Sequence, residues 1–150
     1  MRKPLIIVCL LLVGMLTAAP NARNEDFWQH RYCEGMKIEE HLPSGGRVDC
    51  LSTEFAIEMD WADHWAEAVG QSLYYAGATG RKPAIILICP SSEVHVEGLC
   101  RSDIYRLEYA LKFVNAPIEL WECFPDTDAK LDDCTRPQIQ APDKQLAPKD

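Results

Sequence analysis

The feature that most restricts the fold of this chain is the uninterrupted apolar run PAIILIC, Pro83 to Cys89. A strand that is apolar on both faces is typical of the centre of a sheet covered by helices on both sides. Segments with helical periodicity precede and follow it, at residues 61–79 and 101–116. We therefore expect an α/β fold with a central mixed sheet and helices on both faces.

The remaining elements are expected in a simple order. A short helix over residues 24–35 opens the domain, and a left-handed cap at Gly80 ends the first long helix. The second long helix is expected to begin at a cap formed by Ser102 or Asp103. The whole order is helix, three-strand meander, helix, strand, helix, strand, with the strands in KIEEHL, RVDCL, STEFAIEMD, PAIILIC and IELWECF.

The first 22 residues have the composition of a secretory signal peptide. Arg2 and Lys3 precede an apolar run from Leu5 to Leu16, which is short for a membrane span, and small residues follow. We expect cleavage between residues 18 and 22, no stable membrane span afterwards, and a periplasmic or secreted protein; an uncleaved anchor is the alternative. Residues 23–124 would form the domain, and 125–150 a polar, proline-rich tail that is mostly disordered after about residue 136.

Six cysteines remain after the expected cleavage, because Cys9 lies inside the apolar run. An even number of cysteines in an exported chain predicts disulfides. No CxxC motif is present, and the four histidines have no finger-like spacing, so a structural zinc site is disfavoured. Spacing along the chain favours the pairs Cys33–Cys50, Cys89–Cys100 and Cys123–Cys134.

Side-chain alternation sorts the residues of the three-strand meander onto two faces of the sheet. One face is apolar, and Cys50 lies on it, so a bond to Cys33 would hold the first helix over this face. The apolar set is Ile38, Leu42, Val48, Phe55, Ile57 and Met59. The opposite face collects the acids Glu39, Asp49, Glu58 and Asp60.

The helix over residues 61–79 should border these acids, since His64, Glu67, Gln71 and Tyr75 recur at three- and four-residue spacing. Clustered carboxylates raise one another's pKa unless protons, bases or a hard cation neutralise them. Glu39, Asp49 and Glu58 on a rigid sheet would suit Mg²⁺, Mn²⁺ or Ca²⁺, which prefer oxygen ligands. The alternative is an ordinary solvated sheet edge in an acidic protein.

These motifs resemble the PD-(D/E)XK nuclease superfamily, whose restriction-endonuclease-like core has the element order of residues 24–89. The strand aspartate of that family matches Asp49 in RVDCL, and its acid–any–lysine motif falls on EMD, residues 58–60. A RecB-type branch carries a glutamine and a tyrosine four residues apart on the next helix, which match Gln71 and Tyr75 in QSLYY. The early glutamate of the family would be Glu39, or Glu34. The resemblance covers roughly half of the mature chain, in short motifs.

The resemblance implies an exported, Mg²⁺- or Mn²⁺-dependent phosphodiesterase or nuclease, with metal at Glu39, Asp49 and Glu58. One position departs from the pattern, because Asp60 stands where the family has its lysine. His64, one turn into the next helix, could replace that lysine, and Arg47 could offset charge. Gln71 and Tyr75 would orient the substrate.

Charge favours a second hypothesis. Removing residues 1–22 deletes Arg2 and Lys3 but no acid, so the formal charge falls from −8 to about −10. Nucleic-acid binding depends on Lys and Arg that neutralise phosphates, and this balance disfavours it. The alternative function is therefore a catalytically inactive, exported binding module of the same fold, with a protein or a small ligand as its partner.

Overall fold

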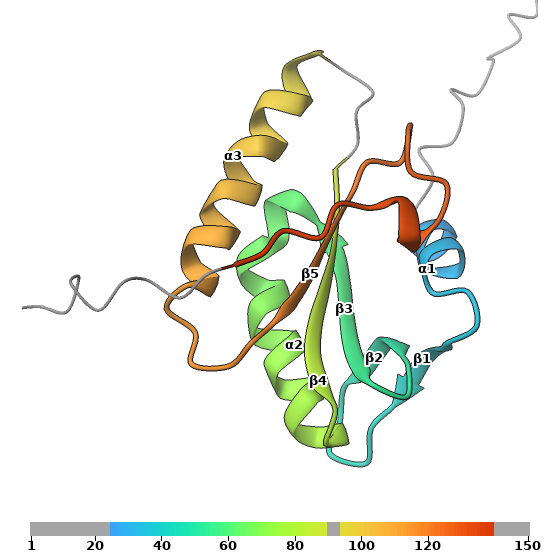
Figure 1. Ribbon diagram of the computed structural model, residues 1–150. Coiled ribbons are helices and arrows are strands. Elements are labelled where there is room, and N and C mark those ends of the chain that lie inside the picture. The colour runs from blue at the N-terminus through green and yellow to red at the C-terminus, as the bar shows by residue number, and fades with distance from the viewer. Residues whose placement is uncertain (1–24, 90–93, 140–150) are drawn as a thin grey trace, which may run out of the picture.

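The computed structural model describes residues 25–89 and 94–139, and the expected signal peptide lies outside them. Five strands form one mixed sheet in the order β1-β2-β3-β4-β5 (Figure 1). The β1–β2 and β2–β3 pairs are antiparallel, whereas β3–β4 and β4–β5 are parallel. The elements are α1 (Glu25–Tyr32), β1 (Lys37–His41), β2 (Arg47–Leu51), β3 (Phe55–Trp61), η1 (Ala62–His64), α2 (Trp65–Thr79), β4 (Lys82–Ile88), α3 (Val94–Leu111), β5 (Glu119–Cys123) and η2 (Leu131–Asp133).

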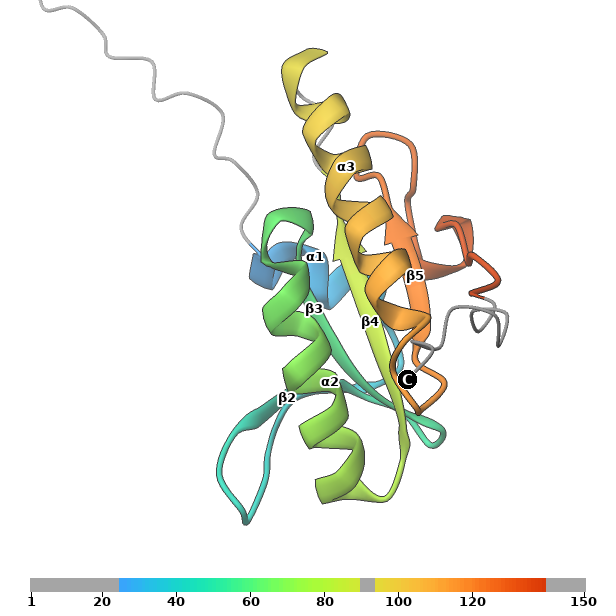
Figure 2. The same ribbon diagram turned by 90° about the vertical axis from the view of Figure 1, so that its left-hand side faces the viewer.

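Helices cover both faces of the sheet, as the apolar run predicted. α2 and α3 pack on one face and α1 on the other (Figures 1 and 2). Strand β4 supplies both cores by alternation, since Ile86 and Ile88 face the α1 side and Ile85 and Leu87 face the α3 side. All four side chains are fully buried. The expected α/β class is confirmed.

The ends of the helices differ in part from the expected ones. A 3-10 turn, η1, precedes α2, and Gly80 ends that helix with a φ of 67°, the expected left-handed cap. Helix α3 begins at Val94, well before the expected cap at Ser102 or Asp103, so that prediction is wrong. It also ends at Leu111, where single turns such as Phe113 N–H to the Ala110 carbonyl, 3.0 Å, replace the helical ladder.

The β1–β2 hairpin departs from the predicted faces. Strand β2 pairs with β3 only through Cys50 and Leu51, and β1 is interrupted at Glu39, which has a φ of 58°. The arm of the hairpin beyond these pairs leaves the plane of the sheet. Val48 and Leu42 consequently pack with Tyr75 of α2 and not with Ile57 and Met59, which corrects the expected apolar face.

The three predicted disulfides are all present. Cys33–Cys50 joins the residue after α1 to β2, Cys89–Cys100 joins the end of β4 to α3, and Cys123–Cys134 closes the segment after β5. Their Cα atoms are 5.8, 5.8 and 4.6 Å apart. Each bond closes a short loop, which restricts the unfolded chain and stabilises the fold.

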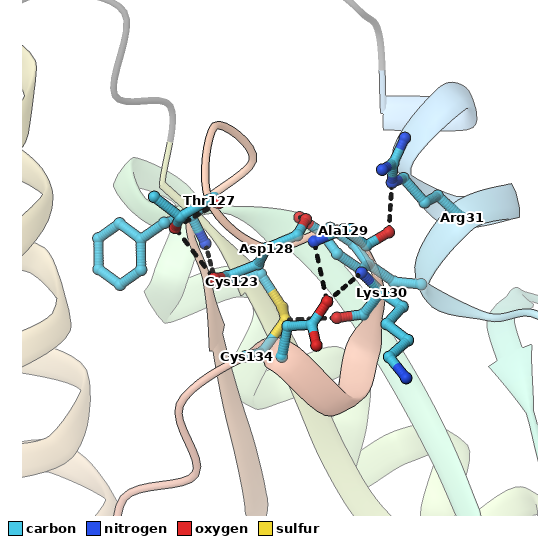
Figure 3. Close-up of a disulfide and its surroundings, with 10 residues drawn as sticks. Arg31, Cys123, Thr127, Asp128, Ala129, Lys130 and Cys134 are labelled. Carbon is cyan, nitrogen blue, oxygen red and sulfur yellow. Dashed lines mark hydrogen bonds between the residues drawn. A yellow bond between two sulfur atoms is a disulfide. The ribbon is translucent and has the colours of Figure 1, made fainter.

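The start of the expected tail is held against the domain. Figure 3 shows the Cys123–Cys134 disulfide and the loop it closes, in which Asp128 accepts a hydrogen bond from the Phe124 N–H at 2.7 Å. The Arg31 side chain of α1 donates to the carbonyl of Ala129 in the same loop (Figure 3). After the disulfide, Thr135 bridges to Glu122 of β5, and Ile139 packs on the α3 side of the core. Residues 140–150, most of the segment expected to be disordered, lie outside the described residues.

No helix among residues 25–89 and 94–139 is both long and apolar enough to cross a membrane.

Candidate functional site

An acidic pocket lies where β3 ends and is lined by residues of α1, β2, β3, η1 and α2. Its cavity volume is about 320 Å³. The lining contains five carboxyl groups, one guanidinium and one imidazole. The complete set is Glu25, Arg47, Asp49, Glu58, Met59, Asp60, His64, Glu67, Gln71 and Tyr75.

Asp49 and Glu58, here called the pocket pair, form the floor of this cavity. Their residues are 7% and 5% exposed. At Asp49, β2 is no longer hydrogen-bonded to β3 through its backbone. The Asp49 carboxylate takes the place of a strand carbonyl, and its Oδ2 accepts a hydrogen bond from the Met59 N–H at 2.8 Å. Neighbouring residues of a strand point to opposite faces of the sheet, and Met59 packs in the core on the α1 side. The Glu58 side chain therefore points to the other face, toward α2.

Burial, followed by the neighbouring Asp49, raises the pKa of Glu58 far above its ordinary value. Burial also raises the pKa of Asp49, against the Met59 N–H bond, which lowers it. The hydrogen bond between the two carboxyl groups needs a proton, since two carboxylates only accept. Glu58 Oε2 is buried and has no hydrogen-bond partner. This oxygen is the strongest sign of a missing ligand, because buried polar atoms are nearly always bonded.

Asp60 and His64 form a second unit at the rim. Asp60 Oδ1 accepts the Trp61 N–H at 2.7 Å and lies 3.1 Å from His64 Nδ1. The Asp60 charge raises the pKa of His64, whose side chain is 56% exposed. With a proton on Nδ1 facing Asp60, the Nε2 of neutral His64 is an acceptor. His64 can therefore take a proton from a group in the pocket.

Three side chains of α2 form a hydrogen-bonded row along one wall. Tyr75 donates to Gln71 Oε1 at 2.9 Å, and Gln71 Nε2 donates to Glu67 Oε1 at 3.1 Å. The predicted helical stripe thus faces the pocket. Burial, then Glu58 and Asp49, raises the pKa of Tyr75, which keeps its hydroxyl a donor at neutral pH.

Glu39, the third predicted metal ligand, is not among the lining residues. Its carboxylate accepts the Gln29 side-chain amide at 2.8 Å and forms an ion pair with Arg47. Gln29 also donates to the Asp49 carbonyl at 3.1 Å, so Glu39 and Asp49 are connected through α1. Among the described residues, no group of three His, Cys, Asp or Glu is placed to hold a metal ion.

Sequence reasoning missed Glu25, which α1 brings to the pocket from the start of the domain. Burial, followed by the charges of Asp49, Asp60 and Glu39, raises the pKa of Glu25. The only signal was its place in the first turn of a helix, where acids are common for other reasons. Its location depends on how the Cys33–Cys50 bond places α1.

Comparisons of the chain with protein-family models, with curated proteins and with solved structures gave no match. The candidate site is therefore interpreted from its own geometry and charge.

Proposed function

We propose that the protein hydrolyses phosphodiesters in the acidic pocket, with one divalent cation, Mg²⁺ or Mn²⁺, held by Asp49 and Glu58. The observation that carries the proposal is the buried, unpartnered Glu58 Oε2 beside the Asp49 carboxyl group. The donor set fits such an ion. Mg²⁺ is commonly bound through one or two protein carboxylates, and waters and substrate phosphates complete its octahedron, so a third protein ligand is not required.

When bound, the cation would polarise the phosphate and a water molecule. The chain supplies the rest of the chemistry. Asp60 orients His64, and His64 Nε2 would accept the proton of the attacking water. In the PD-(D/E)XK enzymes that the chain resembles, the motif lysine has this role. The Gln71 amide would hold a non-reacting phosphate oxygen or the leaving group in line, and the Tyr75 hydroxyl, which donates to Gln71 Oε1, would fix the orientation of that amide.

The acidic pocket also supports the second function, a binding module without catalysis. Among the described residues, no lysine lines the pocket, and Arg47 is paired with Glu39. Little positive charge of the chain itself is thus available to stabilise a phosphorane-like transition state. A cation that bridges the pocket pair to an anionic ligand would then account for the site.

Disulfides form and persist in oxidising compartments, and the three bonds support the proposal that the protein acts in the periplasm or outside the cell.

Titration calorimetry with Mn²⁺ tests the cation site, and release of nitrophenol from bis(4-nitrophenyl) phosphate tests the reaction. We expect binding and hydrolysis in the wild type and neither in Asp49→Asn. Glu122→Gln is the matched control, because Glu122 is equally buried but lies on β5 outside the pocket. Equal Mn²⁺ heats in wild type and Asp49→Asn would exclude the cation site. Binding without hydrolysis of any phosphodiester would favour the binding module.

A further inference from the structure

The rim of the pocket carries charge of the wrong sign for a nucleic-acid strand. Glu25 projects from α1 on one side and Glu67 from α2 on the other, both outside the pocket pair. One divalent cation can neutralise a phosphate at the floor, but phosphates on either side of it would face these two carboxylates. The phosphate and carboxylate charges would repel each other, most strongly at low ionic strength.

The basic side chains of the described residues do not compensate for the rim. Lys82 lies at the start of β4, opposite Phe55, at the other end of the strands from the pocket. Besides Arg47, which pairs with Glu39, four basic side chains are neutralised by neighbouring acids, in the ion pairs Lys37–Glu40, Lys82–Glu54, Arg106–Asp103 and Arg136–Glu119. Among the described residues, Arg47 is the only lysine or arginine that lines the pocket, and it is paired with Glu39, whereas proteins that bind strands follow the phosphates with a positively charged groove.

The cavity has the size of a small-molecule site. Its volume of about 320 Å³ falls in the range of about 300–1,000 Å³ that is typical of pockets for small ligands. Gln71 on one wall offers an amide to a sugar or base.

We propose that the substrate is a small phosphodiester with a single charged phosphate, of mono- or dinucleotide size, and that nucleic-acid strands are excluded by the Glu25 and Glu67 carboxylates. The inference rests on the proposed function, since it names the substrate of the same site. It differs from what the resemblance alone implies, which is a polymer substrate.

The test compares hydrolysis rates per phosphodiester bond, with Mn²⁺ and at low salt, for the dinucleotide TpT, a single-stranded oligothymidylate and a DNA duplex. We expect TpT to react at least about tenfold faster than either polymer, because a cleft of one charge sign changes the encounter rate of a charged ligand by this order or more. Added NaCl should narrow the ratio.

The rim variant Glu25→Gln should raise the rate on oligothymidylate several-fold relative to the rate on TpT. Glu34→Gln is the control, since it removes the same charge from an exposed position outside the pocket. Polymer cleavage at a rate per bond equal to or above that of TpT would overturn the small substrate and leave the proposed hydrolysis standing. No cleavage of any of the three substrates would overturn both.

Discussion

Two pairs of carboxyl groups in this molecule, each built around a buried glutamate, resemble each other and differ in one respect. The pocket pair is Asp49 and Glu58; the second, here called the edge pair, is Glu108 of α3 and Glu122 of the edge strand β5. Each pair contains a buried glutamate with one unpartnered oxygen, Glu58 Oε2 and Glu122 Oε1. In each pair, burial followed by the second carboxyl group raises the pKa of that glutamate.

The surroundings of the pairs are different. The pocket pair opens into a cavity with an imidazole, an amide and a phenol within its walls. The Glu122 side chain of the edge pair lies under α3, among Leu120 and the apolar residues of that core, and its backbone pairs with Thr135. Glu108 lines a smaller cavity together with Lys112, Gln138 and Ile139. A buried, protonated carboxyl group is therefore a sign of a site only where other chemistry converges on it.

The largest expected effect separates the two pairs by activity. Glu58→Gln should lower kcat/KM on bis(4-nitrophenyl) phosphate by at least about 1,000-fold, about 4 kcal/mol, because the amide cannot hold the cation that stabilises the transition state. Glu122→Gln should stay within about twofold of wild type, since ordinary changes away from a site have little effect on it. Equal losses of kcat/KM in both variants would show that the two pairs do not differ in function.

The next effect concerns the edge pair and stability. Burial and Glu108 raise the pKa of Glu122 from its ordinary value of 4.5 to about 7. The folded state thus keeps a proton that the unfolded chain releases, so Glu122 should lower the free energy of unfolding by about 3 kcal/mol as pH rises from 4.5 to about 7. Urea unfolding across this range measures it. Asp49 and Glu58, whose pKa values are also raised, add to the fall, so Glu122→Gln should remove only the share that belongs to Glu122. A fall that is unchanged in the variant would contradict the assignment.

Cation binding should stabilise the folded protein only when both carboxyl groups of the pocket pair are present. At a Mn²⁺ concentration about 100 times the dissociation constant, the free energy of unfolding of the wild type should rise by about 2.7 kcal/mol. Glu122→Gln should gain the same amount, and Glu58→Gln nothing. Thermal unfolding with and without Mn²⁺ gives the comparison, in which a gain shared by Glu58→Gln would place the ion elsewhere.

The smallest effect sharpens the role of Asp60. Because the Asp60 charge raises the pKa of His64, activity should increase with pH as the imidazole loses its proton. Asp60→Asn keeps a carbonyl for the Trp61 N–H but removes the charge, so the rising limb of the pH profile should move to lower pH with a loss in maximal rate of about tenfold or less. His64→Gln should abolish the limb. A limb that persists in His64→Gln would assign it to another group.

Much of the fold follows from local pattern. The apolar run Pro83–Cys89 required cover on both faces, and helical spacing placed His64, Glu67, Gln71 and Tyr75 on one wall. The short distances between cysteines along the chain sufficed to pair them. Alternation within β3 put Glu58 and Asp60 on one face because a strand of seven residues in register with β4 keeps its period of two.

Long-range packing decided the rest. Alternation failed for Val48 and Leu42, since the break at Glu39 and the short β2–β3 ladder turn the hairpin out of the sheet. The edge pair joins residues 14 positions apart on different elements, and no spacing rule connects a helix surface to one position of a later strand.

The sequence by itself determined the order of elements, the disulfides and the carboxylates of the pocket pair, because each depends on periodicity or on distance along the chain. Only the tertiary structure decided that Glu25 closes the pocket and that Glu39 turns to Gln29 and Arg47. These partners come from separate elements, and their meeting depends on where the core seats α1 against the sheet, a property of the whole packed domain and not of any local pattern.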